Sequence, residues 1–587
     1  MKKHTFPILS ILLLSAFTTT SAAASGEASQ SEALRTDERP ALVVNIVVGG
    51  LSYDLLDKLS ANLSDEGFSR FAAQGVRYRA AYYGYMQTLS PAGLATLTTG
   101  ADPSVHGVAG YAWTDYVTGD RVALTEDRSV RGLDTEPGVG RHSGRNLVVP
   151  TVGDELIARW PDSRVVSVAA EPESAVVAGG RRGVAWWMDS SRATWTSSTA
   201  YMDRVPDWVT AYNVAHVANR HIEMGWTPAR TVDLYMSHDT EIFRTQTNLL
   251  QKTTAALKGQ SSAARITSFR KGEVNDYASM LASPHGNTLV ADFARKVVEA
   301  DSLGQRGTTD MLYVCFDAAR TVGQRYGAGS MEAEDMIYRL DYDLAAMVAA
   351  ITARVGEGNV LFVLTSDHGL GGVWDGDTVD GGATPSGGGS GSVGRLGSVG
   401  GSGSAAVARD RFNVGQFKTL VNSFLGVQFG VTDLVLDYVD RQLYLDHNRI
   451  YMQNLSLGEV QSRAAAFALQ FRGVSHALTA TALNGGYFGG GYGGMMQRGF
   501  YPPRGGDLVI DLAPGWIEER AETKSLSGSM YSYDTHVPLI VFGWRVARGA
   551  EVSEPVDMTR VAATIGHIVG TGRPVASEAA VLPRLLP

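Results

Sequence analysis

The segment that most constrains the fold is Leu361–Gly369, with the sequence LFVLTSDHG. Its apolar and β-branched run predicts a buried parallel strand. The run stops at Asp367 and His368, so an acid and an imidazole are expected at the carboxyl end of a strand, where open α/β sheets bind their ligands. A hard oxygen beside a borderline nitrogen suits one divalent cation. Taken alone, the pair is more often a helix N-cap aspartate followed by an incidental histidine.

Other segments place this strand in a larger sheet. Ala41–Val48 is a second apolar run, which ends at Gly49, and the segment MLYVCF around Cys315 is a third. Met331–Val355 lies before the Asp-His strand and carries apolar residues at helical spacing. Strand, helix and strand in this order predict an α/β fold with a doubly wound, mostly parallel sheet.

Composition excludes some classes of protein. The 587 residues carry a formal net charge of −9, which argues against a general nucleic-acid binder, because such a protein needs a basic face. The hydrophobic content of 44% allows a large core. Cys315 is the single cysteine, so no internal disulfide is expected.

The first residues have the pattern of an export signal. Two lysines precede a short apolar run over 6–17, and small residues end at Ala24. We predict a signal peptide over 1–24, a disordered lead-in over 25–38 and a periplasmic or secreted protein. No cysteine lies near the cleavage point, so a lipoprotein anchor is not expected. No later segment has the apolar length of a transmembrane span.

The remaining residues, 39–587, are expected to form one domain with two excursions. Residues from about 186 to 282 are rich in Trp, Tyr and Thr and lack a parallel-strand rhythm, so we predict a cap over the sheet. Residues from about 376 to 406 are rich in Gly and Ser, which predicts a flexible loop at the mouth of the presumed site.

Ser90 is the candidate nucleophile. It precedes a helix-like stretch within TLSPAGLATLTTG, and the amides at the start of a helix favour developing negative charge. For an isolated serine the simpler interpretation is a helix cap.

Several motifs resemble the alkaline phosphatase superfamily, and most of all the exported, phosphate-irrepressible alkaline phosphatases of Bacteroidota. They are LSPAGLATLTTGADPSVHGVAG, SPHGNTLVADFA, SMEAEDMIYRLDYDLA, LTSDHG, MMQRGFYPPRGGD and YDTHVPLIVFG. The resemblance runs from about Ala41 to the C-terminus. It implies a large α/β domain with a cap, two zinc ions, a Ser or Thr nucleophile and a covalent phosphoenzyme. Two metals in such a reaction hold the attacking and leaving oxygens.

The resemblance assigns roles to particular residues, and many of the expected side chains are absent. The retained positions are the nucleophile slot and three metal-ligand slots: Ser90, Asp367, His368 and His536. The lost metal-ligand slots carry Gly49, Arg320 and Gln324. The lost phosphate-binding slots carry Tyr111, Glu171 and Glu173. Half of the implied metal ligands are therefore missing, and two phosphate-binding cations are replaced by acids.

These departures predict a catalytically impaired pseudophosphatase with a binding or scaffolding role. We expect no cofactor and an unknown ligand or protein partner. Arg320 is expected to pair with Asp367 in place of a metal; the other possibility is that Arg320 points to solvent. Glu171 and Glu173 favour a cationic or neutral ligand.

Two other functions stay open. One is a metal-dependent phosphomonoesterase or phosphodiesterase with a remodelled site, in which Ser90 is the nucleophile. Zinc would then be held by Asp367, His368 and Ser90, or by acids such as Asp317 and Glu171. The other is a surface or assembly protein in which only the fold matters.

Overall fold

The computed structural model describes residues 38–238, 240–243, 277–371, 411–521 and 523–586. The predicted signal peptide, nearly all of the lead-in and the Gly/Ser-rich loop over 376–406 lie outside the described residues. Among the helices that are described, none combines the length and the apolar character that a membrane crossing requires.

A ten-stranded sheet forms the centre of the fold and confirms the predicted α/β class. Five neighbouring strands run parallel. In their order across the sheet they are β9 (Val360–Thr365), β1 (Leu42–Val48), β8 (Asp310–Phe316), β5 (Val165–Ala169) and β6 (Val184–Asp189). On the β9 side, β16 (His536–Gly543) is antiparallel to both β9 and β2 (Gly75–Tyr82). At that edge β2 also pairs with β17 (Ala550–Val552) and β18 (Val556–Asp557).

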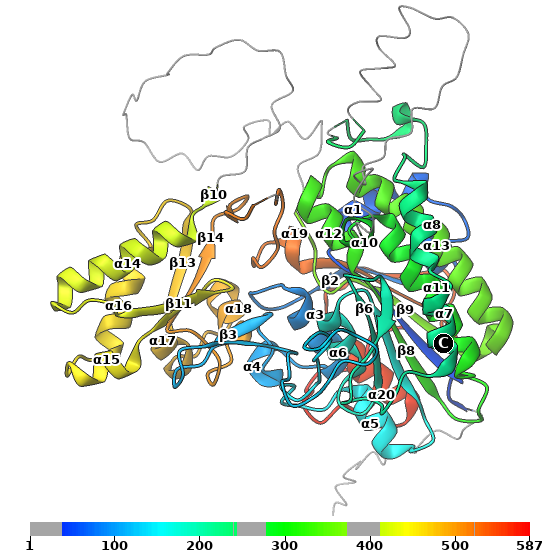
Figure 1. Ribbon diagram of the computed structural model, residues 1–587, viewed down its shortest axis with the longest axis horizontal. Helices are drawn as coiled ribbons and strands as arrows, with labels where there is room; N and C mark the ends of the chain where they lie inside the picture. Colours follow the sequence, from blue (N-terminus) through cyan, green and yellow to red (C-terminus); the bar gives the residue numbers. More distant parts are fainter. Residues whose placement is uncertain (1–37, 239, 244–276, 372–410, 522, 587) are drawn as a thin grey trace, which may run out of the picture. The chain divides into compact units, whose positions relative to one another are not determined.

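Both faces of this sheet are covered by helices (Figure 1). In β1, Val44 and Ile46 pack with residues of α11 (Pro284–Ala300) and α13 (Met331–Val355). Val43 and Val47 point the other way, because side chains alternate along a strand. They belong to the core with α3 (Ser90–Thr99), α5 (Val152–Arg159), α6 (Pro172–Gly179) and α20 (Arg560–Val569). The strand is buried throughout, as its continuous apolar run predicts.

The predicted start of the cap at 186 is wrong. Trp186 and Trp187 belong to β6 of the central sheet, which pairs with β7 (Thr194–Thr196). Both indoles are 2% exposed, so the aromatic composition there reflects burial against the sheet. The chain leaves the sheet only after β7, with α7 (Asp207–Val214), α8 (Val217–Met224) and a return through α10 (Tyr277–Leu281).

Three buried acids at the start of α13 hold the excursion against the sheet. Asp335 accepts hydrogen bonds from the Trp226 indole, the Ala229 amide and the Tyr235 hydroxyl, and pairs with Arg339. Glu334 and Glu332 accept from backbone amides over 236–242 in the same way. Buried carboxylates need such donors, so this part of the excursion and α13 depend on each other.

A second, antiparallel sheet follows the Gly/Ser-rich segment and was not predicted. Its strands, in order, are β11 (Val435–Val439), β12 (Gln442–Leu445), β14 (Leu508–Leu512) and β13 (Val474–Thr479). α14 (Val414–Phe429) and α16 (Leu457–Ala468) share an apolar core with it. The Gly-rich segment 484–497 contains the end of α17 (Ala480–Gly485) and most of α18 (Gly491–Gly499).

Replacing Asp335 should loosen the excursion selectively. Asp335→Ala leaves the Trp226 and Tyr235 donors buried without an acceptor, at a cost of about 3 kcal/mol in unfolding free energy. Amide hydrogen exchange over 226–238, measured by mass spectrometry, should accelerate. Asp233→Ala, at an exposed position of the same segment, is the matched control and should change neither quantity. Unchanged exchange in Asp335→Ala would contradict this role.

Candidate functional site

The carboxyl ends of the parallel strands bring the predicted site residues to one edge of the sheet. Gly49 follows β1, Glu171 comes after β5, and Asp367 and His368 come after β9. Arg320 lies in the first turn of α12 (Asp317–Tyr326), which continues directly from β8. The placement agrees with the rule for open α/β sheets.

Ser90 and His368 are in direct contact. Ser90 is the first residue of α3 and is 2% exposed. Its Oγ lies 3.2 Å from His368 Nε2, while His368 Nδ1 donates to the carbonyl of Gly369 at 2.6 Å. Because Nδ1 carries the proton, Nε2 accepts from the serine hydroxyl. Burial lowers the pKa of His368 and so favours the neutral ring. The nearby Asp367 acts in the opposite direction and raises this pKa.

Asp367 is satisfied mainly by the backbone. Its Oδ1 accepts the amide of Gly50 at 3.0 Å and lies 3.4 Å from Ser366 Oγ. Gly50 adopts φ of +72°, a conformation that glycine reaches without a steric cost. Gly50, the second residue after β1, therefore supplies a donor to Asp367, for which the resemblance predicts a metal-binding role.

Arg320 forms an ion pair with Glu171, whose side chain is 34% exposed. The Nη2 of Arg320 lies 2.5 Å from Glu171 Oε2 and 3.9 Å from Asp317 Oδ1, and the arginine side chain is 8% exposed. Asp317 also accepts from the Glu171 amide and from Ser174 Oγ. Burial, with the nearby Glu171, raises the pKa of Asp317 to about 8, against the effect of Arg320.

The predicted partner of Arg320 is therefore wrong. Asp367 is close enough to raise the pKa of Arg320, but within the described chain the ion pairs of Arg320 are with Glu171 and Asp317. The solvent-exposed alternative is also wrong. A reason lies in Gly49, where an added Cβ would meet Arg320 Cβ at 3.2 Å. The start of α12 lies directly against the end of β1, and the guanidinium extends toward β5.

The other substituted slots fall into two groups. Tyr111 and Gln324 line the same cavity as Ser90 and Arg320. Burial raises the pKa of Tyr111, against the effects of Arg320 and of a hydrogen bond with Ser90. Glu173 does not line this cavity; burial raises its pKa, while a hydrogen bond from its own backbone acts in the opposite direction. The expected acidic lining from Glu171 and Glu173 is therefore not formed.

His536 is held apart in a packed aromatic stack. Its ring lies between Tyr53 and Tyr82, with centroids 4.4 Å away on each side and interplanar angles of 11° and 19°. Its Nε2 donates to the carbonyl of Arg79 at 2.8 Å. His536 does not line the cavity that contains Ser90 and His368.

These residues do not fit a pair of zinc ions. Gly49 has no side chain to coordinate, Arg320 is a cation committed to Glu171, and the Nε2 of His536 already donates to a carbonyl. Throughout the described ranges, no group of three His, Cys, Asp or Glu side chains is arranged to hold a metal ion.

A cavity of about 190 Å³ surrounds Ser90, and sequence reasoning missed much of its lining. The missed polar residues are Gln87, Asp440, Arg441, Glu518, Arg520 and Ser527. Most come from the second sheet and its connections, far along the chain. The only signal for Asp440 and Arg441 is the polar pair between two short apolar segments, which here forms the β11–β12 turn.

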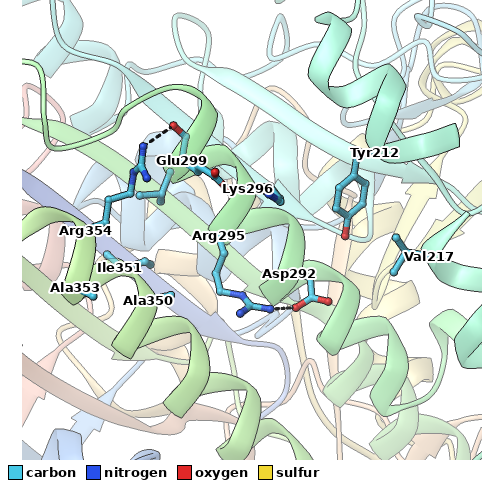
Figure 2. A pocket seen from close by; sticks show the side chains of 11 residues that line it. Tyr212, Val217, Asp292, Arg295, Lys296, Glu299, Ala350, Ile351, Ala353 and Arg354 are labelled. Carbon is cyan, nitrogen blue, oxygen red and sulfur yellow. Dashed lines mark hydrogen bonds and ion pairs between the residues drawn. The ribbon is translucent and has the colours of Figure 1, made fainter. Parts of the chain in front are cut away.

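A larger groove elsewhere is less suited to chemistry. It has a volume of about 610 Å³ and lies among α7, α8, α11 and α13 (Figure 2). Its charged groups neutralise one another: Arg295 pairs with Asp292, and Lys296 pairs with Glu299 at 2.8 Å. Arg354 donates to the backbone carbonyl of Glu299.

Comparisons with known proteins agree with the fold. The model of the type I phosphodiesterase / nucleotide pyrophosphatase family matches residues 43–382, more than half of the chain. Alkaline phosphatase PafA of Elizabethkingia meningoseptica is 27% identical, over 90% of this chain and 92% of that protein. Alkaline phosphatase PhoV of Synechococcus elongatus is 26% identical, over 94% of each. A crystal structure of a PafA variant superposes with a TM-score of 0.79 at 25% identity, covering 94% of this chain and 99% of that one.

The Arg320–Glu171 pair should show an asymmetric energetic cost. Arg320→Met removes the cation beside Glu171 and Asp317 and should lower the unfolding free energy by about 1 to 3 kcal/mol, because the partly exposed Glu171 keeps part of its hydration. Glu171→Gln should cost less, because Asp317 stays beside Arg320. Urea denaturation of both single variants and the double variant should give a coupling energy of about 1 to 3 kcal/mol. Arg325→Met, at an exposed position of the same helix, is the control; additive effects at 171 and 320 would contradict the pair.

Proposed function

The chain belongs to the type I phosphodiesterase / nucleotide pyrophosphatase family, within the alkaline phosphatase superfamily, and we propose that it is an exported, catalytically impaired member. In this proposal it uses the crevice at the strand ends to bind a ligand or partner. The signal peptide predicted over 1–24 supports export. The bound group is recognised and held, and no phosphate ester is hydrolysed.

The single observation that carries this proposal is the ion pair between Arg320 and Glu171. Family resemblance gives one of these positions to a metal-binding acid and the other to a phosphate-binding cation. Here the two charges are exchanged between the positions and neutralise each other. A guanidinium repels a divalent cation, and a carboxylate repels a phosphate, so the pair disfavours both parts of the expected complex.

One observation favours a second candidate, a phosphomonoesterase or phosphodiesterase with Ser90 as nucleophile. The contact of Ser90 Oγ with His368 Nε2 at 3.2 Å gives the hydroxyl an acceptor for its proton. The hydroxyl also lies at the amino end of α3, where backbone amides favour negative charge. This second candidate function needs catalytic groups in addition to Ser90 and His368.

Zinc content and hydrolysis separate these candidates. The purified protein is dialysed first against zinc and then against zinc-free buffer, and its metal content is measured by mass spectrometry. We expect close to no zinc per chain, and no hydrolysis of p-nitrophenyl phosphate above that of Ser90→Ala. Zinc retention together with Ser90-dependent turnover would overturn the proposed function in favour of the second candidate.

Restoring the missing ligands should make stability depend on zinc. The variant Gly49→Asp/Arg320→Asp/Gln324→His concentrates carboxylates around Asp317, so without metal it should unfold more easily than the parent. Zinc at about one hundred times its dissociation constant should then stabilise it by about 2.7 kcal/mol. Gly49→Ala/Arg320→Asn/Gln324→Leu is the control and should not respond. Thermal unfolding with and without zinc measures both; no response in the first variant would contradict the assignment of these slots.

A further inference from the structure

A separate cavity lies at the other end of the strands that carry the candidate site. It has a volume of about 360 Å³. Gly358, just before β9, and Gly543, the last residue of the antiparallel β16, both line it. Asp367 and His368 follow the opposite end of β9. The proposed function therefore gives this cavity no role.

Three arginines line this cavity. They are Arg70 of α2 (Phe68–Gln74) and, in the segment after β16, Arg545 and Arg548. Arg545 and Arg548 are exposed, and neither has an ion pair within the described ranges. The Nη1 of Arg70 lies 3.6 Å from Glu66, whose side chain is 76% exposed, and so exposed a pair is weak. The three guanidinium groups are therefore largely uncommitted, and two of them are open to solvent.

Acids do little to offset these cations. Among the described residues that line the cavity, Glu357 is the one acid, and it is exposed. The whole chain has a formal net charge of −9. Three arginines beside one glutamate are therefore a local excess of positive charge in an acidic protein. Such an excess in a concave site raises the local concentration of anions.

The backbone of Arg545 is in an unfavourable conformation at the rim of the cavity. Its φ is 49°, in the left-handed region that few side chains adopt. Its guanidinium carbon lies 5.2 Å from the centre of the Trp544 ring, and this cation–π contact orients it. Glycine would make the same turn without a steric cost. Residues that persist in such conformations often lie at ligand sites, so the strained arginine points to a binding role.

The floor of the cavity is apolar. Phe362 and Phe542 are partners in β9 and β16, and their rings stack at 4.7 Å with an interplanar angle of 8°. They are 2% and 4% exposed, so they shape the floor while the rim supplies the polar contacts. The volume of about 360 Å³ is within the range of pockets for small organic ligands. A carbon skeleton suits such a floor better than a hydrated inorganic ion does.

We propose that this cavity binds a small polycarboxylate, an organic anion with two or three carboxylates on a short carbon skeleton. Each guanidinium group offers paired N–H donors that match one carboxylate. Arg545 and Arg548 donate from the exposed rim, and Arg70 donates from α2. A phosphate ion concentrates its charge at one point and would engage fewer of the arginines at once. The inference is independent of the proposed function, because the two sites lie at opposite ends of the strands.

Calorimetry on the full protein tests the ligand class with three probes: propane-1,2,3-tricarboxylate, butyrate and inorganic phosphate. Ionic strength is held constant, because salt screens exposed charges. We expect the tricarboxylate to bind about tenfold tighter than butyrate or phosphate. No binding of the tricarboxylate, or equal or tighter binding of either other probe, would overturn the proposal.

Substitution of the strained arginine separates a binding role from a structural one. Arg545→Gly should weaken the tricarboxylate about tenfold, whereas the melting temperature should not fall, because glycine suits the backbone at this position. A purely structural role would give the reverse, a lower melting temperature and unchanged affinity, and that result would overturn the assignment. Arg548→Gln should also weaken binding. Arg463→Gln, at an exposed position of α16, is its matched control and should not.

Changes of opposite sign at the rim provide a further test. Glu357→Gln removes the acid and should tighten the tricarboxylate severalfold, while Gly358→Asp adds an acid and should weaken it. A Cβ at Gly358 meets nothing within 4 Å, and the same is true of Gly458, so Gly458→Asp is the matched control. Unchanged affinity in both rim variants would contradict the site.

One variant tests the location of the bound anion. Arg520 lines the cavity beside Ser90, and its side chain is 53% exposed. Arg520→Gln should leave the affinity for the tricarboxylate unchanged. Loss of binding in this variant would place the anion in the crevice and overturn the proposal.

Discussion

The arrangement of the crevice depends on the ion pair between the buried Arg320 and the partly exposed Glu171. A guanidinium removed from water must have an anionic partner, and Glu171 supplies it here. The same cation lies near Asp317, and the Cβ of Arg320 occupies the space beside Gly49. Asp367 accepts from the Gly50 amide. Glu171, Asp317 and Asp367 therefore each have an ion-pair or hydrogen-bond partner within the described chain.

Much of the central fold follows from the sequence. The strands at Ala41–Val48, around Cys315 and at Leu361–Thr365 are continuous apolar runs, and the helix over Met331–Val355 has a clear apolar stripe. Because parallel strands present their carboxyl ends at one edge, the meeting of Asp367, His368 and Arg320 near that edge could be expected. Each of these sequence signals is local, and the parallel sheet brings the residues that carry them to one edge.

The partner of Arg320 could not be read from the sequence in the same way. Knowing that an arginine occupies position 320 does not specify the direction of its long, flexible side chain. Three acids, Glu171, Asp317 and Asp367, lie near it. Asp440 and Arg441 were missed because their hairpin lacks the glycine or asparagine that marks such turns. Gln87 was missed because no sequence motif marks it, and only the tertiary fold brings it to the cavity. Composition also misled: the tryptophans at 186 and 187 indicated an excursion, although they are packed on the sheet.

The close approach of Gly49 to Arg320 has a consequence for substitutions at this edge of the sheet. A Cβ at 49 would lie 3.2 Å from Arg320 Cβ, so one of the two residues must shift to admit a larger side chain. Loss of Arg320 alone removes the cation beside Glu171, and loss of Glu171 alone leaves the cation with only a more distant partner. The glycine, the arginine and the glutamate are therefore coupled, and changes at the three positions should be better tolerated together than one at a time.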